Sequence, residues 1–239
     1  MLSKQDIKLI KSLNQKKFRQ QHGLFCVEGI KSIQEFLNSH LELHQLYATD
    51  AAFSSEYEII TATELQKISS LKSPNKALAV FKIPKNQQSA SEGLILMLDD
   101  IRDPGNLGTI IRLCDWYGIK DLVCSATTVD CYNPKVVQAT MGSLTRVRVS
   151  YVDLKAYLEG SNEPVFGTFM DGDTIYTQTL PQNGIVIMGN EANGISKDIE
   201  ALVTKKLSIP RFGSLQATES LNVATATAIV LSEFKRADL

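Results

Sequence analysis

The chain has 239 residues, of which 44% are hydrophobic and 21% charged, and its formal net charge is −1. Length and composition are those of a globular protein that buries a substantial core in one large or two ordinary domains. No basic and apolar run opens the sequence and no apolar stretch has spanning length. We therefore expect a cytoplasmic protein rather than a secreted or membrane-inserted one.

Cysteine usage argues against a metal site. The four cysteines form no C-x-x-C pair, and three of them lie in or beside apolar segments, where a free thiol behaves as a small hydrophobic side chain. We expect all four to be buried and reduced, namely Cys26, Cys114, Cys124 and Cys131.

Charge is unevenly distributed. Residues 1–90 contain 12 basic and 8 acidic side chains, whereas the remainder is net negative, which favours two regions with different surfaces. Much of the positive charge lies at the start, in Lys4, Lys8, Lys11, Lys16, Lys17 and Arg19. A basic first helix of this kind either contacts RNA phosphates or presents an ordinary solvated face, and the pattern leaves both open.

The first 83 residues have the pattern of a small alternating α/β unit. Strands are predicted at 24–28, 44–48, 56–60 and 77–82, with helices after Gly29 and after Thr61 or Thr63. The segment between Pro84 and Gly93 is polar and turn-rich, as linkers are. We therefore predict a first domain at 1–83, a linker at 84–92 and a second domain at 93–239.

The second domain begins with a continuous apolar run at 94–98, typical of a strand buried on both faces of a parallel sheet. After the Pro104-Gly105 turn, Asn106 is predicted to cap a helix. The apolar face of this helix contains Leu107, Ile110, Ile111 and Cys114. Arg112 lies off that face, on the side of Gly108, whose missing side chain leaves room for a group to approach the guanidinium.

Strands and helices alternate through the rest of this domain. Strands are predicted at 121–125, 146–150, 164–169, 184–189 and 206–209, and helices near 134–142, 153–159 and 196–204. The fold class is therefore α/β with a mainly parallel sheet. No G-x-G-x-x-G run follows the first strand, which disfavours a Rossmann-type NAD site, and no P-loop is present either. All three histidines lie in the first domain, so catalysis in the second has no imidazole base.

Three polar clusters follow apolar runs of the second domain. They are Asp103-Pro104-Gly105-Asn106 with Arg112, Gly189-Asn190-Glu191, and Glu219-Ser220-Leu221-Asn222. The carboxyl ends of parallel strands meet at one edge of a sheet, where loops form binding sites. We therefore expect the clusters to assemble one active site.

The clusters also resemble the three motifs of the SpoU (TrmH-like) family of RNA ribose 2′-O-methyltransferases, in the SPOUT superfamily. Residues 98–118 resemble motif 1, residues 187–196 motif 2 and residues 209–224 motif 3, in the family's order. Upstream, Phe25-Cys26-Val27-Glu28-Gly29 and the segment Ala77–Phe81 of the last predicted strand are similar to the RNA substrate-binding domain of ribosomal-RNA members. The resemblance implies a catalytic domain with a deep trefoil knot that binds S-adenosyl-L-methionine, and a homodimer formed through that domain.

The resemblance also implies roles for five polar residues. Arg112 would engage the target ribose and its phosphate and help to deprotonate the 2′-hydroxyl, with another group sharing the proton because guanidinium stays protonated. Asn106 would position Arg112 or the ribose, and Glu191 would support the site. Ser220 and Asn222 would lie near the nucleotide and the knot. Each has a plain alternative, since Asn106, Ser220 and Asn222 suit helix caps and Glu191 suits a solvated loop.

Cofactor contacts are implied by position. Thr168, Gly189, Ile209 and Leu221 match the family's adenosylmethionine contacts. The loop at 211–219 is longer than the commonest family form and lies beside the cofactor pocket in the family, so its effect on cofactor binding is open.

The first domain favours ribosomal RNA as the substrate implied by the resemblance. Two alternatives stay within the fold: a transfer-RNA ribose 2′-O-methyltransferase and a non-catalytic RNA-binding member. A different α/β enzyme, such as a nucleotide-dependent oxidoreductase, is disfavoured by the missing glycine fingerprints.

Overall fold

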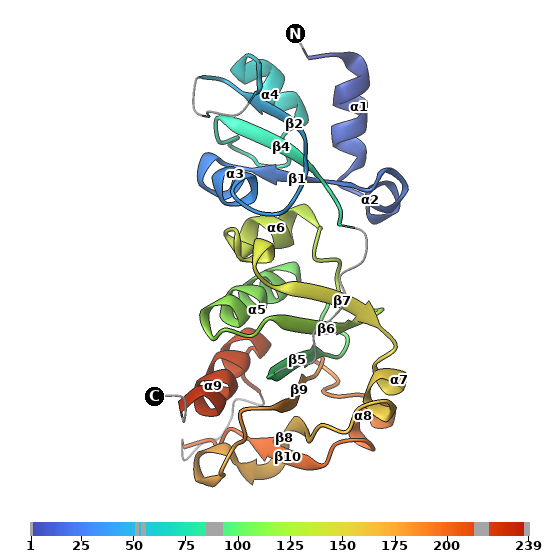
Figure 1. Ribbon diagram of the computed structural model, residues 1–239, viewed down its shortest axis with the longest axis vertical. Helices are drawn as coiled ribbons and strands as arrows, with labels where there is room; N and C mark the ends of the chain where they lie inside the picture. The colour runs from blue at the N-terminus through green and yellow to red at the C-terminus, as the bar shows by residue number, and fades with distance from the viewer. Residues whose placement is uncertain (1, 51–52, 54–55, 85–92, 213–219, 237–239) are drawn as a thin grey trace. The chain divides into compact units, whose positions relative to one another are not determined.

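The computed structural model describes residues 2–50, 53, 56–84, 93–212 and 220–236. The chain divides into two compact units (Figure 1). The first consists of Met1–Asn86 with Asp130–Thr145, and the second of Gln87–Val129 with Arg146–Leu239. The predicted linker at 84–92 lies, apart from Pro84, outside the described residues.

The first unit is built on a four-stranded sheet in the order β1-β4-β2-β3. β4 runs antiparallel to both β1 and β2, and β3 runs parallel to β2. The strands are β1 (Leu24–Glu28), β2 (Leu43–Ala48), β3 (Glu58–Ile59) and β4 (Ala77–Lys82). The helices are α1 (Lys4–Ser12), α2 (Lys16–His22), α3 (Ile30–Leu37), α4 (Ala62–Ile68) and α6 (Pro134–Thr140). The predicted strands are confirmed, whereas the basic start of the chain forms two helices.

Residues 130–145 belong to the first unit although they are far away in the sequence. The Tyr132 ring lies 4.7 Å from the ring of Phe25, which belongs to β1. A side chain at Gly142 would also meet Glu35 of α3 at 2.8 Å. The expectation that the second domain holds all of 93–239 therefore differs from the structure, because these contacts are long-range and leave no local pattern.

Arg19 anchors the same segment. Its Nε donates to Asp130 Oδ2 at 2.9 Å, and its Nη1 donates to the carbonyl oxygen of Leu13 at 2.7 Å. The Arg19 side chain is only 2% exposed. The interpretation of Arg19 as part of a basic surface is therefore wrong, because a buried guanidinium paired within the protein is not available to phosphate.

The second unit contains a six-stranded sheet in the order β10-β8-β9-β5-β6-β7, and every strand pair is parallel. Its strands are β5 (Leu94–Leu98), β6 (Asp121–Ser125), β7 (Arg148–Val152), β8 (Val165–Thr174), β9 (Gly184–Met188) and β10 (Lys205–Ser208). Its helices are α5 (Pro104–Trp116), α7 (Leu154–Glu159), α8 (Lys197–Glu200) and α9 (Val223–Lys235). The predicted α/β class with a parallel sheet is confirmed. The predicted knot depends on 213–219, which lie outside the described residues, and it stays a prediction.

Helices cover the sheet of the second unit on both faces (Figure 1). Ile95 and Met97 of β5 share a core cluster with Leu154 and Leu158 of α7 and Ile199 of α8. On the other face, α5 and α9 pack against each other. Every residue of β5 is buried, as its continuous apolar run predicts.

All four cysteines are buried and none of them forms a disulfide, as the sequence predicts. In the part of the chain that the structure describes, no helix is long and apolar enough to cross a membrane.

Candidate active site

The first site segment is the turn between β5 and α5. Asp103 has extended backbone angles, and its Oδ1 accepts a hydrogen bond from the backbone N–H of Asn106 at 2.8 Å. Asp103 is therefore the N-cap, Pro104 occupies the first helical position, and Asn106 lies inside the first turn. The prediction that Asn106 caps the helix is wrong, and the consequence is that its side chain is free to make contacts elsewhere.

The second segment is the loop after β9. Asn190 and Gly194 form an isolated antiparallel bridge, with backbone hydrogen bonds of 3.0 and 2.9 Å. A Cβ at Gly189 would lie 2.3 Å from the backbone carbon of Gly194, so the tight loop requires glycine there. Glu191 lies at the exposed start of this loop.

The third segment is the start of α9. Asn222 caps this helix, because its Oδ1 accepts hydrogen bonds from the N–H groups of Ala224 at 3.0 Å and Thr225 at 3.3 Å. The alternative that Asn222 serves as a helix cap is therefore confirmed. Its Nδ2 remains available as a donor.

The three segments meet in a chain of side-chain hydrogen bonds. Asn222 Nδ2 donates to Asn106 Oδ1 at 2.9 Å, and Asn106 Nδ2 donates to Glu191 Oε1 at 2.8 Å. An ionised carboxylate only accepts, so Asn106 must present its NH₂ group to Glu191 and its oxygen to Asn222. The chain therefore has one direction, from the start of α9 towards the carboxylate.

Arg112 lies on the same helix as Asn106, six residues later and about 9 Å further along the axis. Its side chain is exposed, whereas the neighbouring Ile111 is buried. No described residue accepts a hydrogen bond from the guanidinium or pairs with it. A permanent cation in this state is suited to bind an anion from outside the chain.

Ser220 is exposed and stands outside the hydrogen-bond chain. Leu221 beside it is 49% exposed. The structure thus brings together three of the five predicted polar residues, Asn106, Glu191 and Asn222, and leaves Arg112 and Ser220 open to solvent.

Three of the four residues predicted to contact a cofactor lie on neighbouring strands or directly after them, whereas Leu221 directly precedes the cap of α9. Thr168 of β8 is one residue beyond the last β8–β9 register pair, and Gly189 directly follows β9. Thr168 Oγ1 donates to the carbonyl oxygen of Ile187 at 3.2 Å. Ile209 follows β10, the strand on the other side of β8, and is half-buried.

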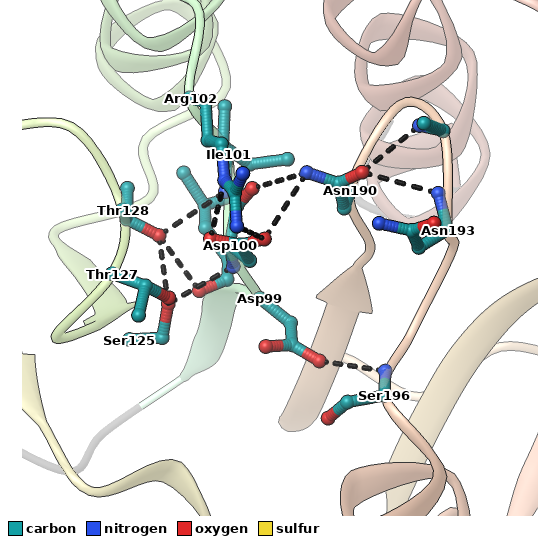
Figure 2. A network of polar contacts seen from close by, with 12 residues as sticks. Asp99, Asp100, Ile101, Arg102, Ser125, Thr127, Thr128, Asn190, Asn193 and Ser196 are labelled. Carbon is teal, nitrogen blue, oxygen red and sulfur yellow. Dashed lines mark hydrogen bonds and ion pairs between the residues drawn. The ribbon is translucent and has the colours of Figure 1, made fainter.

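Sequence reasoning missed the polar network behind these loops (Figure 2). Asp99 Oδ2 accepts a hydrogen bond from the N–H of Ser196 at 2.8 Å, and Asn190 reaches Asp100 across the gap between two strand ends. The hydrogen bond and the charge of Asp100 raise the pKa of Arg102. The only available signal was that Asp99, Asp100 and Asn190 are polar residues at the ends of buried strands.

Two family models match the chain. Residues 93–232 match the SpoU rRNA Methylase family, and residues 4–79 match the MRM3-like substrate binding domain.

Individual relatives match over nearly the whole length. The chain is 29% identical over 239 residues to a 23S rRNA (guanosine(2553)-2′-O)-methyltransferase of Bacillus subtilis, covering 95% of this chain and 94% of the relative. A TrmH-family structure from Porphyromonas gingivalis is 37% identical with a TM-score of 0.90 and covers 99% of both chains. An rRNA methyltransferase from Sinorhizobium meliloti with bound AdoMet is 25% identical, with a TM-score of 0.87, and covers 100% of this chain and 98% of its own.

The family model for residues 93–232 spans more than half of the chain and includes every residue of the hydrogen-bond chain described above. The protein therefore belongs to the SpoU rRNA methylase family.

Proposed function

We propose that the protein transfers the methyl group of S-adenosyl-L-methionine to a ribose 2′-hydroxyl of ribosomal RNA. The observation that carries this proposal is the chain from Asn222 through Asn106 to Glu191, which joins three separate segments. Arg112, which has no polar partner among the described residues, lies on the same helix as Asn106. A hydrogen-bond chain alone does not identify a reaction. The full-length similarity to a 23S rRNA 2′-O-methyltransferase supplies the reaction class.

The reaction needs few protein groups. The 2′-oxygen forms a bond to the methyl carbon while the carbon–sulfur bond breaks, and the hydroxyl proton leaves to a phosphate oxygen or water. Arg112 would hold the neighbouring phosphate and stabilise the negative charge that develops on the 2′-oxygen. Asn106 would orient the ribose with the N–H that Glu191 does not use, since its NH₂ group has two donors.

The predicted cofactor residues have suitable chemistry for adenosylmethionine. Gly189 gives a backbone position without a side chain, and the half-buried Thr168 and Ile209 offer a hydroxyl and an apolar surface on adjacent strands. Leu221 would complete the apolar wall from the start of α9. When bound, the cofactor supplies a methyl group already activated by the sulfonium. Residues 213–219 precede Leu221 in the sequence and lie outside the described residues.

Ribosomal RNA is favoured over transfer RNA by the first unit. This unit matches a substrate binding domain, and the similarity to the Bacillus rRNA enzyme extends over both units.

Lys4, Lys8 and Lys11 are all exposed and follow each other at helical spacing along α1. We assign this lysine face to RNA phosphate contact. Replacing the three by glutamine should raise the KM for RNA and flatten its salt dependence while leaving kcat unchanged.

A homodimer formed through the second unit is part of the proposal, as is a cytoplasmic location. Trp116 lies one helical turn after Arg112 and is 83% exposed, and aromatic side chains of this size are enriched at protein interfaces. A second copy covering Trp116 would lie beside Arg112. Sedimentation should show a dimer that Trp116→Asp weakens, and a monomer at all concentrations would refute it.

The function is tested with purified protein, radiolabelled adenosylmethionine and deproteinised ribosomal or transfer RNA. Label should enter ribosomal RNA, and nuclease digestion with mass spectrometry should identify a 2′-O-methylated nucleotide. Incorporation of label into transfer RNA alone would reject ribosomal RNA as the substrate and favour a transfer-RNA ribose 2′-O-methyltransferase. No incorporation into naked RNA, ribosomal particles or transfer RNA, with adenosylmethionine still bound, would support a non-catalytic RNA-binding protein.

A further inference from the structure

Asn190 uses its side chain to join two loops. Its Nδ2 donates to the carbonyl oxygen of Asp100 at 2.7 Å and lies 3.3 Å from Asp100 Oδ2. Its Oδ1 accepts hydrogen bonds from the N–H groups of Ala192 at 2.9 Å and Asn193 at 3.1 Å. One buried side chain therefore holds its own loop closed and fastens it to the turn that precedes α5 (Figure 2).

Asp100 has a left-handed backbone conformation, which is uncommon for a residue other than glycine. Its φ is +60°, and aspartate tolerates this region better than most residues but still adopts it rarely. Its N–H donates to Ser125 Oγ at 2.9 Å, and its carboxylate pairs with Arg102 at 3.0 Å. Such strain persists only where the surroundings over-determine it, and the bond from Asn190 is one of the restraints.

These two residues lie directly behind the hydrogen-bond chain of the site. Glu191 follows Asn190 in the sequence, and the turn at Asp100 leads into Asp103, the cap that begins α5 and so sets the position of Asn106. Two contacts join these segments, namely Asn190 with Asp100 and Glu191 with Asn106 of the first turn of α5. A loop shift of about 1 Å at such a place is enough to lower a rate about a hundredfold.

We propose that Asn190 and Asp100 form a clamp that positions Glu191 against Asn106 for methyl transfer. The inference rests on the proposed function. Both are positioning residues, because they act through Glu191 and Asn106 rather than by touching the substrate. Loss of the clamp should lower kcat about 10- to 100-fold, as loss of outer-shell support does at other sites, with little change in the KM for RNA.

The test uses three variants of the full-length protein. Asn190→Ala removes the whole clamp. Asn190→Ser keeps a short oxygen acceptor near the loop N–H groups but cannot reach Asp100. Asn193→Ala is the matched control, because only the backbone N–H of Asn193 takes part in the network and alanine retains it. The first two should lower kcat, and the control should leave kcat unchanged.

A double-mutant cycle separates positioning from a general loss of stability. If Asn190 acts through Glu191, then Asn190→Ala should have little further effect on kcat in a Glu191→Ala background. The clamp would be overturned if the separate reductions in kcat caused by Asn190→Ala and Glu191→Ala multiplied in the double variant. A folded Asn190→Ser protein with the kcat of the wild type would overturn it as well. Near-ultraviolet circular dichroism verifies folding. The wild-type protein is measured in parallel: if it transfers no methyl group to any RNA, the proposed function has failed, whereas an active wild type with an equally active Asn190→Ser variant rejects the clamp alone.

Discussion

The side-chain amide of Asn106 donates a hydrogen bond to Glu191 over 2.8 Å, although 85 residues separate them in the sequence. This contact decides the orientation of the Asn106 amide, because Glu191 offers only acceptors. The oxygen of the same amide accepts a hydrogen bond from Asn222, so one residue of α5 contacts two other segments of the site. The Asn106 side chain must therefore offer both a donor and an acceptor, which a substitution can test directly.

Asn106→Asp tests that constraint with almost no change in volume. The new carboxylate would face Glu191 and lose the donor, so charge repulsion replaces a hydrogen bond. We expect kcat to fall at least about a hundredfold in a folded protein, comparable to the loss of one stabilising donor in other active sites. Thr109→Ala, an exposed substitution one turn later, is the control in the same assay. Activity of Asn106→Asp near that of Thr109→Ala would contradict the assignment.

Asn222 has two tasks that one substitution separates. Asn222→Asp keeps an oxygen that caps α9 but loses the Nδ2 donor to Asn106. The free energy of unfolding should change by less than about 0.5 kcal/mol, since aspartate is as good a cap as asparagine, while kcat falls at least about tenfold. Asn222→Ala should lose the cap as well, at about 1 kcal/mol. Urea unfolding and methyl transfer are measured on both, and an active Asn222→Asp protein would mean that the cap is the whole role.

Arg112 is expected to be essential without being structural. Arg112→Ala should abolish detectable methyl transfer and leave the unfolding transition unchanged, because the side chain is exposed and contacts no described polar partner. Arg112→Lys should restore little, since an ammonium lacks the planar fork that binds phosphate oxygens in pairs. Arg236→Ala, which removes an exposed arginine at the end of α9, is the control. Retained activity in Arg112→Ala would refute its catalytic assignment.

The strands that were easiest to predict are those buried on both faces. The run at 94–98 is continuous and apolar, and the run at 121–125 has the apolar centre Leu122-Val123-Cys124. They form β5 and β6 with the predicted bounds. β8 continues to Thr174, beyond the predicted end at 169, because it pairs with β10 after a register shift that has no local signature. The assignment of 130–145 to the first unit depends on contacts such as Arg19 with Asp130, which no local pattern reveals.

The site was predictable in its residue types but not in its connections. Polar residues after strands indicated where Asn106, Glu191 and Asn222 would gather. The cap was assigned to Asn106 instead of Asp103, although a capping aspartate followed by proline is the stronger start signal. The clamp of Asn190 on Asp100 was missed because it depends on which strand ends become neighbours, and only the sheet order determines that.

Removal of one partner of the buried pair of Arg19 and Asp130 should strongly destabilise the first unit. Arg19→Met removes the cation and leaves the Asp130 carboxylate almost buried, so the free energy of unfolding should fall by about 3–5 kcal/mol. Arg19→Met with Asp130→Asn should recover part of this loss, because the uncompensated charge disappears. The exposed neighbour Lys17→Met should change stability by no more than about 0.5 kcal/mol. Equal urea midpoints for Arg19→Met and Lys17→Met would contradict the prediction.

Stability should decline in alkaline solution because a buried thiol keeps its proton in the folded state. Burial, aided by the charge of Glu28, raises the pKa of Cys26 from 9.0 to about 12. Between these values the unfolded chain binds fewer protons than the folded one, so the free energy of unfolding falls as the pH rises from about 9 towards 12. Tyr47 adds to the same trend, since burial raises its pKa from 10.0 to about 12. Urea unfolding at a series of pH values should show the decline, and Cys26→Ala should reduce its slope. An unchanged slope in Cys26→Ala would show that this thiol does not govern the alkaline loss.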